Sequence, residues 1–236
     1  MRSIIATIIF LVITIVLSII SLPFAIIDRS GKSYLWFARI WAKIFLALYG
    51  IRLKVEGVHH ISKSEHYVFA SNHTSYADIP AILGGIPHDI RLVLRSSLTL
   101  VPIWGWALLV SPMIIINRSS PAKAKRTLAG AVQKIRDGAS VLLFPEGTRT
   151  PDGRLQEFKR GAFHIAYQSG AKVLPVALIG TYDVLPRQKK MPKSGMNVIV
   201  RIGAALEADS TLVSDREKEM DLMKQCEAAV SNLLSS

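Results

Sequence analysis

The sequence predicts an α/β fold in which a mixed, mostly parallel sheet is flanked by helices and preceded by an N-terminal hydrophobic two-helix membrane motif. From Arg52 onward, short apolar runs with the character of strands alternate with segments of helical periodicity, which is the pattern of a sheet covered by helices. Before that point the chain is strongly apolar. We therefore divide it into an anchoring segment, residues 1–51, and a folded domain, residues 52–236, which has the size of one domain.

The first apolar segment, Ile4–Ile27, contains 24 residues without a charge. As a helix it would be about 36 Å long at ~1.5 Å per residue, enough to cross about 30 Å of hydrocarbon. Ser18, Ser21 and Pro23 are expected to break up its second half. The segment either spans the bilayer or forms a hairpin in one leaflet with the next helix. A cleaved signal peptide is disfavoured, because Arg2 alone would form its basic region and the apolar run is long.

The second segment, Tyr34–Ile51, has large apolar side chains at helical spacing, with Arg39 and Lys43 between them. This pattern predicts a helix in the membrane interface, with tryptophan rings at headgroup depth and the basic side chains extended towards water. If the first segment spans the bilayer, the positive charges of Arg29 and Lys32 outnumber those before it and place the following domain in the cytoplasm.

Seven strands and four helices are predicted in the domain. The strands lie at 52–55, 67–70, 91–94, 113–116, 141–144, 173–178 and 198–202, and the helices at 76–83, 122–136, 160–168 and 215–234. Ser120 can cap the second helix, Pro121 suits its first turn and Gly138 can end it. Ser214 and Glu217 have the spacing of a capping box at the start of the last helix.

The composition indicates a membrane partner. Lysine and arginine outnumber aspartate and glutamate by 29 to 17, the formal charge is +12, and 50% of the residues are hydrophobic. An apolar and basic chain suits an anionic membrane, whereas nucleic acid is disfavoured because no nucleic-acid motif is present. The one cysteine, Cys226, allows no internal disulfide and is expected in the core.

Two polar motifs follow predicted strands, and the first supplies His73 and Asp78. Histidine suits a general base because its ordinary pKa is near neutrality, and a carboxylate on one ring nitrogen keeps the other free to accept a proton. The spacing of five works if His73 lies in a loop and Asp78 lies in a helix capped by Thr74 or Ser75, with Asn72 bracing the turn. Taken alone, a histidine before a helix is more often a cap or a core residue.

The second motif supplies Glu146, Gly147, Thr148 and Arg149. Glycine permits close backbone approach, threonine adds a hydroxyl, and the guanidinium fork suits phosphate. Alone, this stretch is equally well a polar turn. Lys159, at the start of a later helix, is a second phosphate contact or simply a solvated residue. Because the carboxyl ends of parallel strands share one edge of a sheet, both motifs are expected to meet there, together with the segment that ends in Arg118.

Other common sites are missing from the sequence. It contains no phosphate-binding G-x-x-x-x-G-K-[ST] loop and no G-x-S-x-G nucleophile elbow. It contains neither H-E-x-x-H nor C-x-x-C, so zinc is disfavoured. His59 and His60 are adjacent but have no clear third ligand, and we interpret them as structural or exposed.

These motifs resemble those of a known family, the glycerolipid acyltransferases. Asn72–Asp78 resembles the H-x4-D signature of that family, and Phe144–Arg149 resembles its F-P-E-G-T-R block. Ile115–Arg118 is similar to the middle block, Leu174–Ala177 to the fourth block, and Phe158–Phe163 also fits. Order and spacing match over roughly residues 55 to 205. The nearest pattern is that of bacterial 1-acylglycerol-3-phosphate acyltransferases, which also begin with an apolar membrane motif.

The resemblance implies a mechanism without metal or cofactor. His73 would deprotonate the sn-2 hydroxyl of lysophosphatidic acid while Asp78 orients it, and the alkoxide would attack acyl-CoA or an acyl-carrier protein thioester without an acyl-enzyme. The expected substrate-binding residues are Glu146, Gly147, Thr148, Arg149, Arg118, Arg95 and Lys159. The partners implied are the lysophospholipid, the acyl thioester or its carrier protein, and the anionic membrane, with the bacterial inner (cytoplasmic) membrane as the location.

Three positions depart from the family pattern. Arg95 stands where lysine is common, Ser97 replaces a glutamate, and Asn117 stands where aspartate often precedes the middle-block arginine. The positive charge at Arg95 is kept, so phosphate contact is expected to survive, but the acceptor stays open. The alternatives are an acyltransferase for another lysolipid, including phosphate-free lyso-ornithine lipids, a non-catalytic lipid-binding membrane protein of the same fold, and a His/Asp metal phosphohydrolase.

Overall fold

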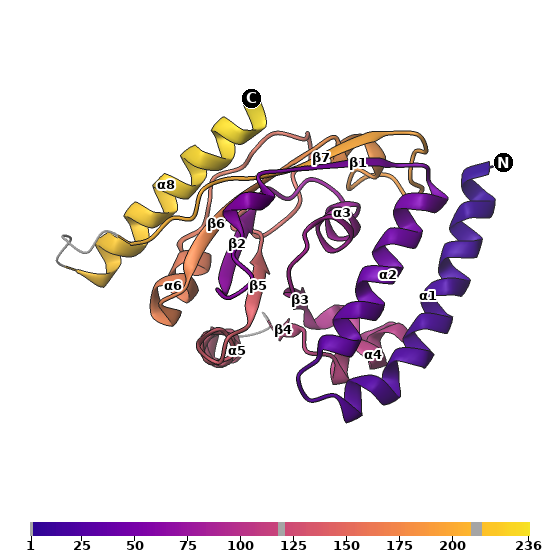
Figure 1. Cartoon of the computed structure of the whole chain (residues 1–236), viewed down its shortest axis with the longest axis horizontal. Helices are drawn as coiled ribbons and strands as arrows, with labels where there is room; N and C mark the ends of the chain where they lie inside the picture. Colours follow the sequence, from indigo (N-terminus) through magenta and orange to yellow (C-terminus); the bar gives the residue numbers. More distant parts are fainter. Residues whose placement is uncertain (1, 118–120, 209–213) are drawn as a thin grey trace.

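A seven-stranded sheet forms the centre of the structure, a computed structural model that describes residues 2–117, 121–208 and 214–236 (Figure 1). The strand order is β1-β7-β6-β2-β5-β3-β4. Neighbouring strands are parallel except for β6 and β7, which run antiparallel. The prediction of a mixed, mostly parallel sheet flanked by helices is therefore confirmed.

All seven predicted strands are present, and each end lies within one residue of its predicted position. The strands are β1 Arg52–Glu56, β2 Tyr67–Ser71, β3 Ile90–Arg95, β4 Ile114–Ile116, β5 Ser140–Leu143, β6 Lys172–Ile179 and β7 Asn197–Ile202. The helices are α1 Arg2–Ile27, α2 Lys32–Leu48, α3 Asp78–Gly85, α4 Trp104–Val110, α5 Pro121–Arg136, α6 Arg160–Ser169, α7 Thr181–Val184 and α8 Asp215–Ser235, with 3-10 turns η1 Val58–His60 and η2 Ser96–Leu100.

The predicted domain helices are confirmed as α3, α5, α6 and α8, and the capping box is present, because the Ser214 side chain accepts from the Glu217 amide while the Glu217 carboxylate accepts from Ser214. The predicted cap Ser120 lies outside the described residues. Two short helices, α4 and α7, and the two 3-10 turns were not predicted. The α4 sequence has no charge, and its N-cap, Ile103, makes no side-chain cap bond, so it lacks the usual start signals.

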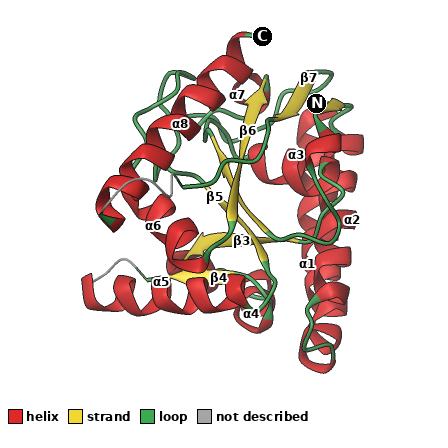
Figure 2. Ribbon diagram, turned by 60° about the vertical axis from the view of Figure 1, so that its left-hand side comes forward, coloured by secondary structure: helices red, strands yellow, loops and turns green. Residues whose placement is uncertain are grey.

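Helices cover both faces of the sheet (Figure 2). Side chains alternate along a strand, so Val68 and Ala70 of β2 pack with α5, α6 and α8, while Tyr67 and Phe69 pack on the side of α2 and α3. Every position of β2 and β5 is buried. Burial on both faces explains why these central strands are nearly continuous apolar runs rather than alternating ones.

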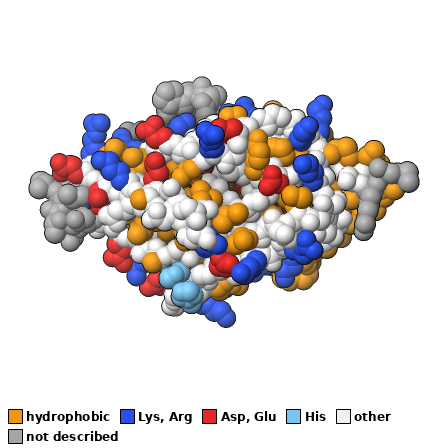
Figure 3. Space-filling model, turned by 90° about the horizontal axis from the view of Figure 1, so that it is seen from above, with side chains coloured by type: hydrophobic (Ala, Val, Ile, Leu, Met, Phe, Trp, Pro, Cys, Tyr) orange, Lys and Arg blue, Asp and Glu red, His pale blue; other side chains and the backbone are white. Residues whose placement is uncertain are grey.

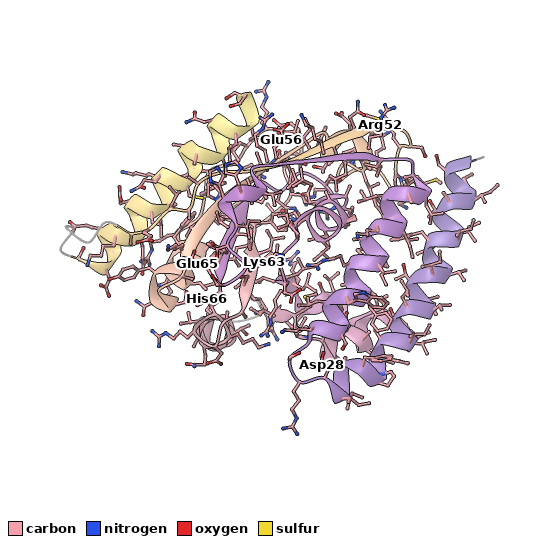
Figure 4. All side chains as sticks on the ribbon, viewed as in Figure 1. Asp28, Arg52, Glu56, Lys63, Glu65 and His66 are labelled. Carbon is pink, nitrogen blue, oxygen red and sulfur yellow. The ribbon has the colours of Figure 1, made fainter. Side chains whose placement is uncertain are left out.

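The N-terminal helices α1 and α2 lie side by side and antiparallel (Figure 1). Phe10 of α1 contacts the rings of Trp41 and Phe45 at centroid distances of 5.3 and 5.1 Å, and Trp41 Nε1 donates to Thr14 Oγ1 at 3.0 Å. Asp28 stabilises the turn between the helices by accepting from the amides of Ser30 and Ser33 (Figure 4). The predicted two-helix motif is present, and α1 is long and apolar enough to cross a membrane.

One expectation about this motif is wrong. Ser18, Ser21 and Pro23 do not break up the first helix, which continues to Ile27. Its serine hydroxyls donate to backbone carbonyls of the preceding turn, so their polar groups are satisfied without leaving the helix. The guanidinium of Arg39 donates to the His88 carbonyl at 2.7 Å and lies 3.5 Å from Asp89, contacts that were not predicted, and the placement of α2 in the membrane interface stays a prediction. The domain boundary at residue 51 stays a prediction.

The outer strand β1 is tied to β7 by side chains as well as by its ladder. Arg52 Nε donates to Asn197 Oδ1 at 2.7 Å, and Arg201 Nε donates to Glu56 Oε2 at 2.6 Å; Arg52 and Glu56 lie along the upper strand in Figure 4.

Viewed from above, lysine and arginine side chains are spread among acidic and hydrophobic ones rather than gathered into one groove (Figure 3).

Candidate active site

His73 lies just beyond the carboxyl end of β2, at a position fixed by Asn72. The Asn72 side chain donates to the Leu178 carbonyl at 3.0 Å and accepts from the Leu178 amide at 2.8 Å. These bonds join the end of β2 to β6 and pair the buried side-chain amide with one backbone residue. The prediction that Asn72 braces the turn is confirmed, and the brace sets where the histidine leaves the sheet.

His73 and Asp78 meet directly. The Nδ1 atom of His73 lies 2.8 Å from Asp78 Oδ2, and the Asp78 carboxylate is fully buried while the imidazole is 20% exposed. An ionised carboxylate can only accept, so Nδ1 carries a proton, and in the neutral imidazole Nε2 then has a free lone pair. The ring also stacks on Phe144, with centroids 3.8 Å apart and planes at 13°. The imidazole is therefore held from its edge and from one face.

Asp78 also organises the turn that precedes it. Its Oδ2 atom accepts from the amides of Thr74 and Ser75 at 2.8 and 2.9 Å, in addition to His73. Helix α3 begins at Asp78, and Ala77 occupies the N-cap position without a side-chain cap bond. The expectation that Thr74 or Ser75 caps this helix is wrong, because the carboxylate folds back over the loop and takes the two amides itself.

Glu146 supports His73 from the loop that follows the neighbouring strand β5. Its buried carboxylate accepts from the His73 amide at 2.8 Å through Oε1 and from Gln156 Nε2 at 2.8 Å through Oε2. Burial raises the pKa of the Glu146 carboxyl to about 7, and these hydrogen bonds oppose that rise. The Thr150 amide donates to the His73 carbonyl at 2.9 Å, so the 144–150 loop holds both backbone groups of the histidine.

Gly147 and Lys159 lie against each other. Gly147 has φ +77° and its amide donates to the Phe144 carbonyl, which closes the turn after β5. A Cβ at this position would lie 3.3 Å from Lys159 Nζ. The Lys159 amide in turn donates to the Pro145 carbonyl at 3.0 Å. The structure therefore brings the predicted lysine to the predicted glycine turn.

Arg149 lies over an aromatic ring. Its guanidinium carbon is 3.4 Å from the ring centroid of Tyr76, which belongs to the same loop as His73. Its buried Nη1 atom has no hydrogen-bond partner among the described residues. A buried guanidinium N–H without a partner needs an explanation, and an anionic ligand supplies one. The pairing with Tyr76 was not predicted, because nothing in the local pattern of either motif signals a contact across 73 residues.

Two other predicted residues are placed less directly. Thr148 is exposed, and its carbonyl accepts from Gln156 Nε2 at 3.2 Å. Arg95 is exposed at the carboxyl end of β3, on the same edge of the sheet as His73. Arg118 lies outside the described residues. Gln156, which joins Glu146 to Thr148, was missed because a lone glutamine carries no sequence signal.

An apolar cavity of about 450 Å³ adjoins this site. It lies among α1, α2, α3, η2, α4 and the strand β3, and Tyr76 and Ile79 of the His73 loop and α3 are part of its wall. Other wall residues are Trp41, Leu94, Trp104 and Leu108. One aromatic side chain, Tyr76, therefore contacts both the guanidinium of Arg149 and the apolar cavity.

Among the described residues, no three His, Cys, Asp or Glu side chains gather as a metal site.

The fold and this site define a class of protein. Residues 52–179, more than half of the chain, match the family model described as Acyltransferase. The chain therefore belongs to the acyltransferase family, which the resemblance of its motifs implied.

The most informative relatives are 1-acyl-sn-glycerol-3-phosphate acyltransferases. A chloroplastic one from Arabidopsis thaliana is 33% identical over 175 residues, which are 73% of this chain and 49% of that protein. The human alpha form is 28% identical over 180 residues, 76% of this chain and 64% of that protein. The crystal structure of the 1-acyl-sn-glycerophosphate acyltransferase PlsC from Thermotoga maritima is similar with a TM-score of 0.77 and 26% identity, over 98% of this chain and 97% of that one. This chain spans about half the length of the plant relatives.

Proposed function

We propose that this chain is a membrane-attached O-acyltransferase that moves a fatty acyl group from acyl-CoA or an acyl-carrier protein to the sn-2 hydroxyl of lysophosphatidic acid, giving phosphatidic acid. The observation that carries the proposal is the junction at Tyr76, where the ring supports the guanidinium of Arg149 and also forms part of the cavity wall, within three residues of His73. Lysophosphatidic acid combines a phosphate, a hydroxyl and a hydrocarbon chain. The junction offers a cation, a base and an apolar cavity for these three groups.

The chemistry needs only groups that the chain supplies. Nε2 of His73 accepts the proton of the sn-2 hydroxyl as the oxygen attacks the thioester carbonyl. The buried carboxylate of Asp78 stabilises the imidazolium that forms. When the tetrahedral intermediate collapses, the C–S bond breaks and the departing thiolate takes the proton back from Nε2. The ester is formed, the free thiol leaves, and His73 returns to its starting state without an acyl-enzyme.

The remaining site residues bind the substrate or stabilise the loop that carries His73. Arg149 is the main phosphate contact because its buried N–H lacks a partner among the described residues, and Lys159 adds a second positive charge over the Gly147 turn. The Glu146 carboxylate already accepts from the His73 amide and from Gln156. It therefore stabilises the loop that carries His73, in addition to the predicted substrate contact. Arg95 and Arg118 are kept as predicted contacts on the same edge.

The membrane assignment rests on α1 and on charge. Most large side chains of α1 are exposed, and a helix of this length and hydropathy suits a bilayer rather than water. The charge of +12 favours an anionic surface. We place the protein at the bacterial inner membrane with its catalytic domain on the cytoplasmic side.

An acceptor panel tests the proposal. The protein in detergent is given labelled acyl-CoA, or the same acyl chain on an acyl-carrier protein, with lysophosphatidic acid, lysophosphatidylethanolamine, lysophosphatidylglycerol or a lyso-ornithine lipid. Product on lysophosphatidic acid, at a rate at least ten times that on the others, supports the assignment. Faster transfer to another acceptor would keep the mechanism and change the substrate. No transfer from either donor to any acceptor, by folded protein, would favour a non-catalytic lipid-binding role.

A further inference from the structure

The segment of residues 96–111, formed by η2 and α4, exposes apolar side chains that the site does not use. It contains no charged residue. Leu100 is 82% exposed, Leu109 61% and Trp106 57%, and the smaller side chains Val101 and Val110 are also exposed. Soluble surfaces rarely gather large apolar side chains in this way without a partner. Elsewhere in the described part of the domain, the exposed large apolar side chains are Tyr76 at 56% and Val58 and Met191 at 38% each.

The segment has a second, inward face. Leu98, Trp104 and Leu108 form part of the cavity wall, whereas Leu100, Trp106 and Leu109 point away from the protein. The two short elements pack tightly, since a Cβ at Gly105 would collide with the Thr99 carbonyl. The wall between cavity and exterior is therefore one compact, uncharged layer along this stretch.

This outward face is continuous with the anchoring helices. Helix α4 packs against α1, and a Cβ at Gly31, in the turn between α1 and α2, would collide with Pro112, which follows α4 (Figures 1 and 2). Exposed basic side chains border the patch, with Arg29 in that turn, Lys32 at the start of α2 and Arg95 just before η2. An apolar patch with a basic border is complementary to the hydrocarbon and headgroup layers of an anionic bilayer.

We propose that the segment of residues 96–111 is a second membrane-inserting element, which places the outer side of the cavity wall in the lipid so that hydrocarbon chains reach the cavity from the bilayer. The inference rests on the proposed function, because the cavity is taken to hold an acyl chain. The occupant of the patch is the lipid surface, and Leu100, Trp106 and Leu109 enter the acyl layer while Arg95 stays with the phosphates.

Probe fluorescence tests the insertion. In a Cys226→Ala background, cysteine is placed at Leu100, at Leu109, at Ile8 of α1 and at Lys224, an exposed residue of α8. Each is labelled with a nitrobenzoxadiazole probe and bound to phosphatidylethanolamine–phosphatidylglycerol vesicles containing spin-labelled lipid. We expect blue-shifted, quenched emission at 100, 109 and 8, and a water-like spectrum at 224. Quenching at 8 alone would overturn the inference, and quenching at none would overturn membrane attachment with it.

Activity gives a second test. Leu100→Ser with Leu109→Ser is compared with wild type and with Val58→Ser, an exposed apolar residue of η1. We expect transfer to a long-chain lysophosphatidic acid held in vesicles to fall about ten-fold or more in the double variant, because two inserted leucines are lost. Transfer to a short-chain, monomeric lysophosphatidic acid should stay at the wild-type rate, which reports the chemistry separately. An equal loss of activity with both substrates would contradict the inference. So would a wild-type dimer that dissociates in the double variant while the activity on vesicles is unchanged.

Discussion

Replacing Asp78 by asparagine isolates the charge of the carboxylate from its hydrogen bonds. Oδ2 accepts from three donors, His73 Nδ1 and the amides of Thr74 and Ser75, at 2.8 to 2.9 Å. If the asparagine placed its NH₂ group there, it would face three donors, so the carbonyl oxygen is expected at this position. The loop geometry and the tautomer of His73 are then retained, and the negative charge is removed.

The magnitude follows from the ion pair that forms during the reaction. With about 4 Å between charge centres and an effective dielectric constant of about 20, the imidazolium–carboxylate attraction is about 4 kcal/mol. Loss of that attraction in the transition state lowers kcat about 10³-fold. If part of the population adopts the opposite amide orientation, the proton moves to Nε2 and the loss approaches about 10⁴-fold. The apparent KM should change little, because the Asp78 side chain is fully buried and accessible to neither substrate.

The assay is the initial rate of phosphatidic acid formation, with thermal unfolding measured on the same samples. Asp28→Asn is the matched control, because Asp28 also accepts from nearby amides but lies in the α1–α2 turn. We expect the control to keep its rate. A kcat for Asp78→Asn within ten-fold of wild type, with both variants folded, would refute the role of Asp78 as counter-charge.

Three further substitutions test other contacts. Arg149→Ala should raise the apparent KM for lysophosphatidic acid about ten- to a hundred-fold, since charge-assisted hydrogen bonds contribute about 1.5–3 kcal/mol, with kcat nearly kept; an unchanged KM would show that Arg149 does not bind the phosphate. Glu146→Gln should flatten the dependence of stability on pH. The Glu146 carboxyl has a pKa of about 7 in the folded protein and about 4.5 in the unfolded chain, so the free energy of unfolding of wild type should fall by up to about 3 kcal/mol as the pH rises between these values. The same pH dependence of the unfolding free energy in wild type and Glu146→Gln, measured by denaturant titration, would contradict this. Asn72→Ala should cost about 2–4 kcal/mol by leaving both Leu178 backbone groups unpaired, and unchanged hydrogen exchange at the Leu178 amide would argue against the brace.

The parts of the fold that local patterns control were predictable. The central strands β2 and β5 are apolar runs that are buried on both faces, and α8 begins with its capping box. Helix α4 was not predictable in this way, because its uncharged sequence offers neither a cap nor a polar face. The continuity of α1 through Pro23 was also missed, since residues that interrupt helices in water are tolerated in a long apolar helix.

The candidate site shows the same division. The pairing of His73 with Asp78 joins residues five apart, so the spacing within a single motif was enough to indicate it. The contacts of Tyr76 with Arg149 and of Gln156 with Glu146 depend on how two loops meet, and the sequence of either loop alone does not encode them. The cavity is built from six elements, so its walls come together only when the chain has folded.

The most direct test of the account is acyl transfer to lysophosphatidic acid by wild type and His73→Ala side by side, in detergent, with acyl-CoA and acyl-carrier protein as donors. Nε2 of His73 is the proposed proton acceptor, so phosphatidic acid should form with wild type and fall to background with the variant, while binding of the lysolipid persists. Phosphatidic acid formation by folded His73→Ala at a rate near that of wild type would contradict the role of His73 as the base.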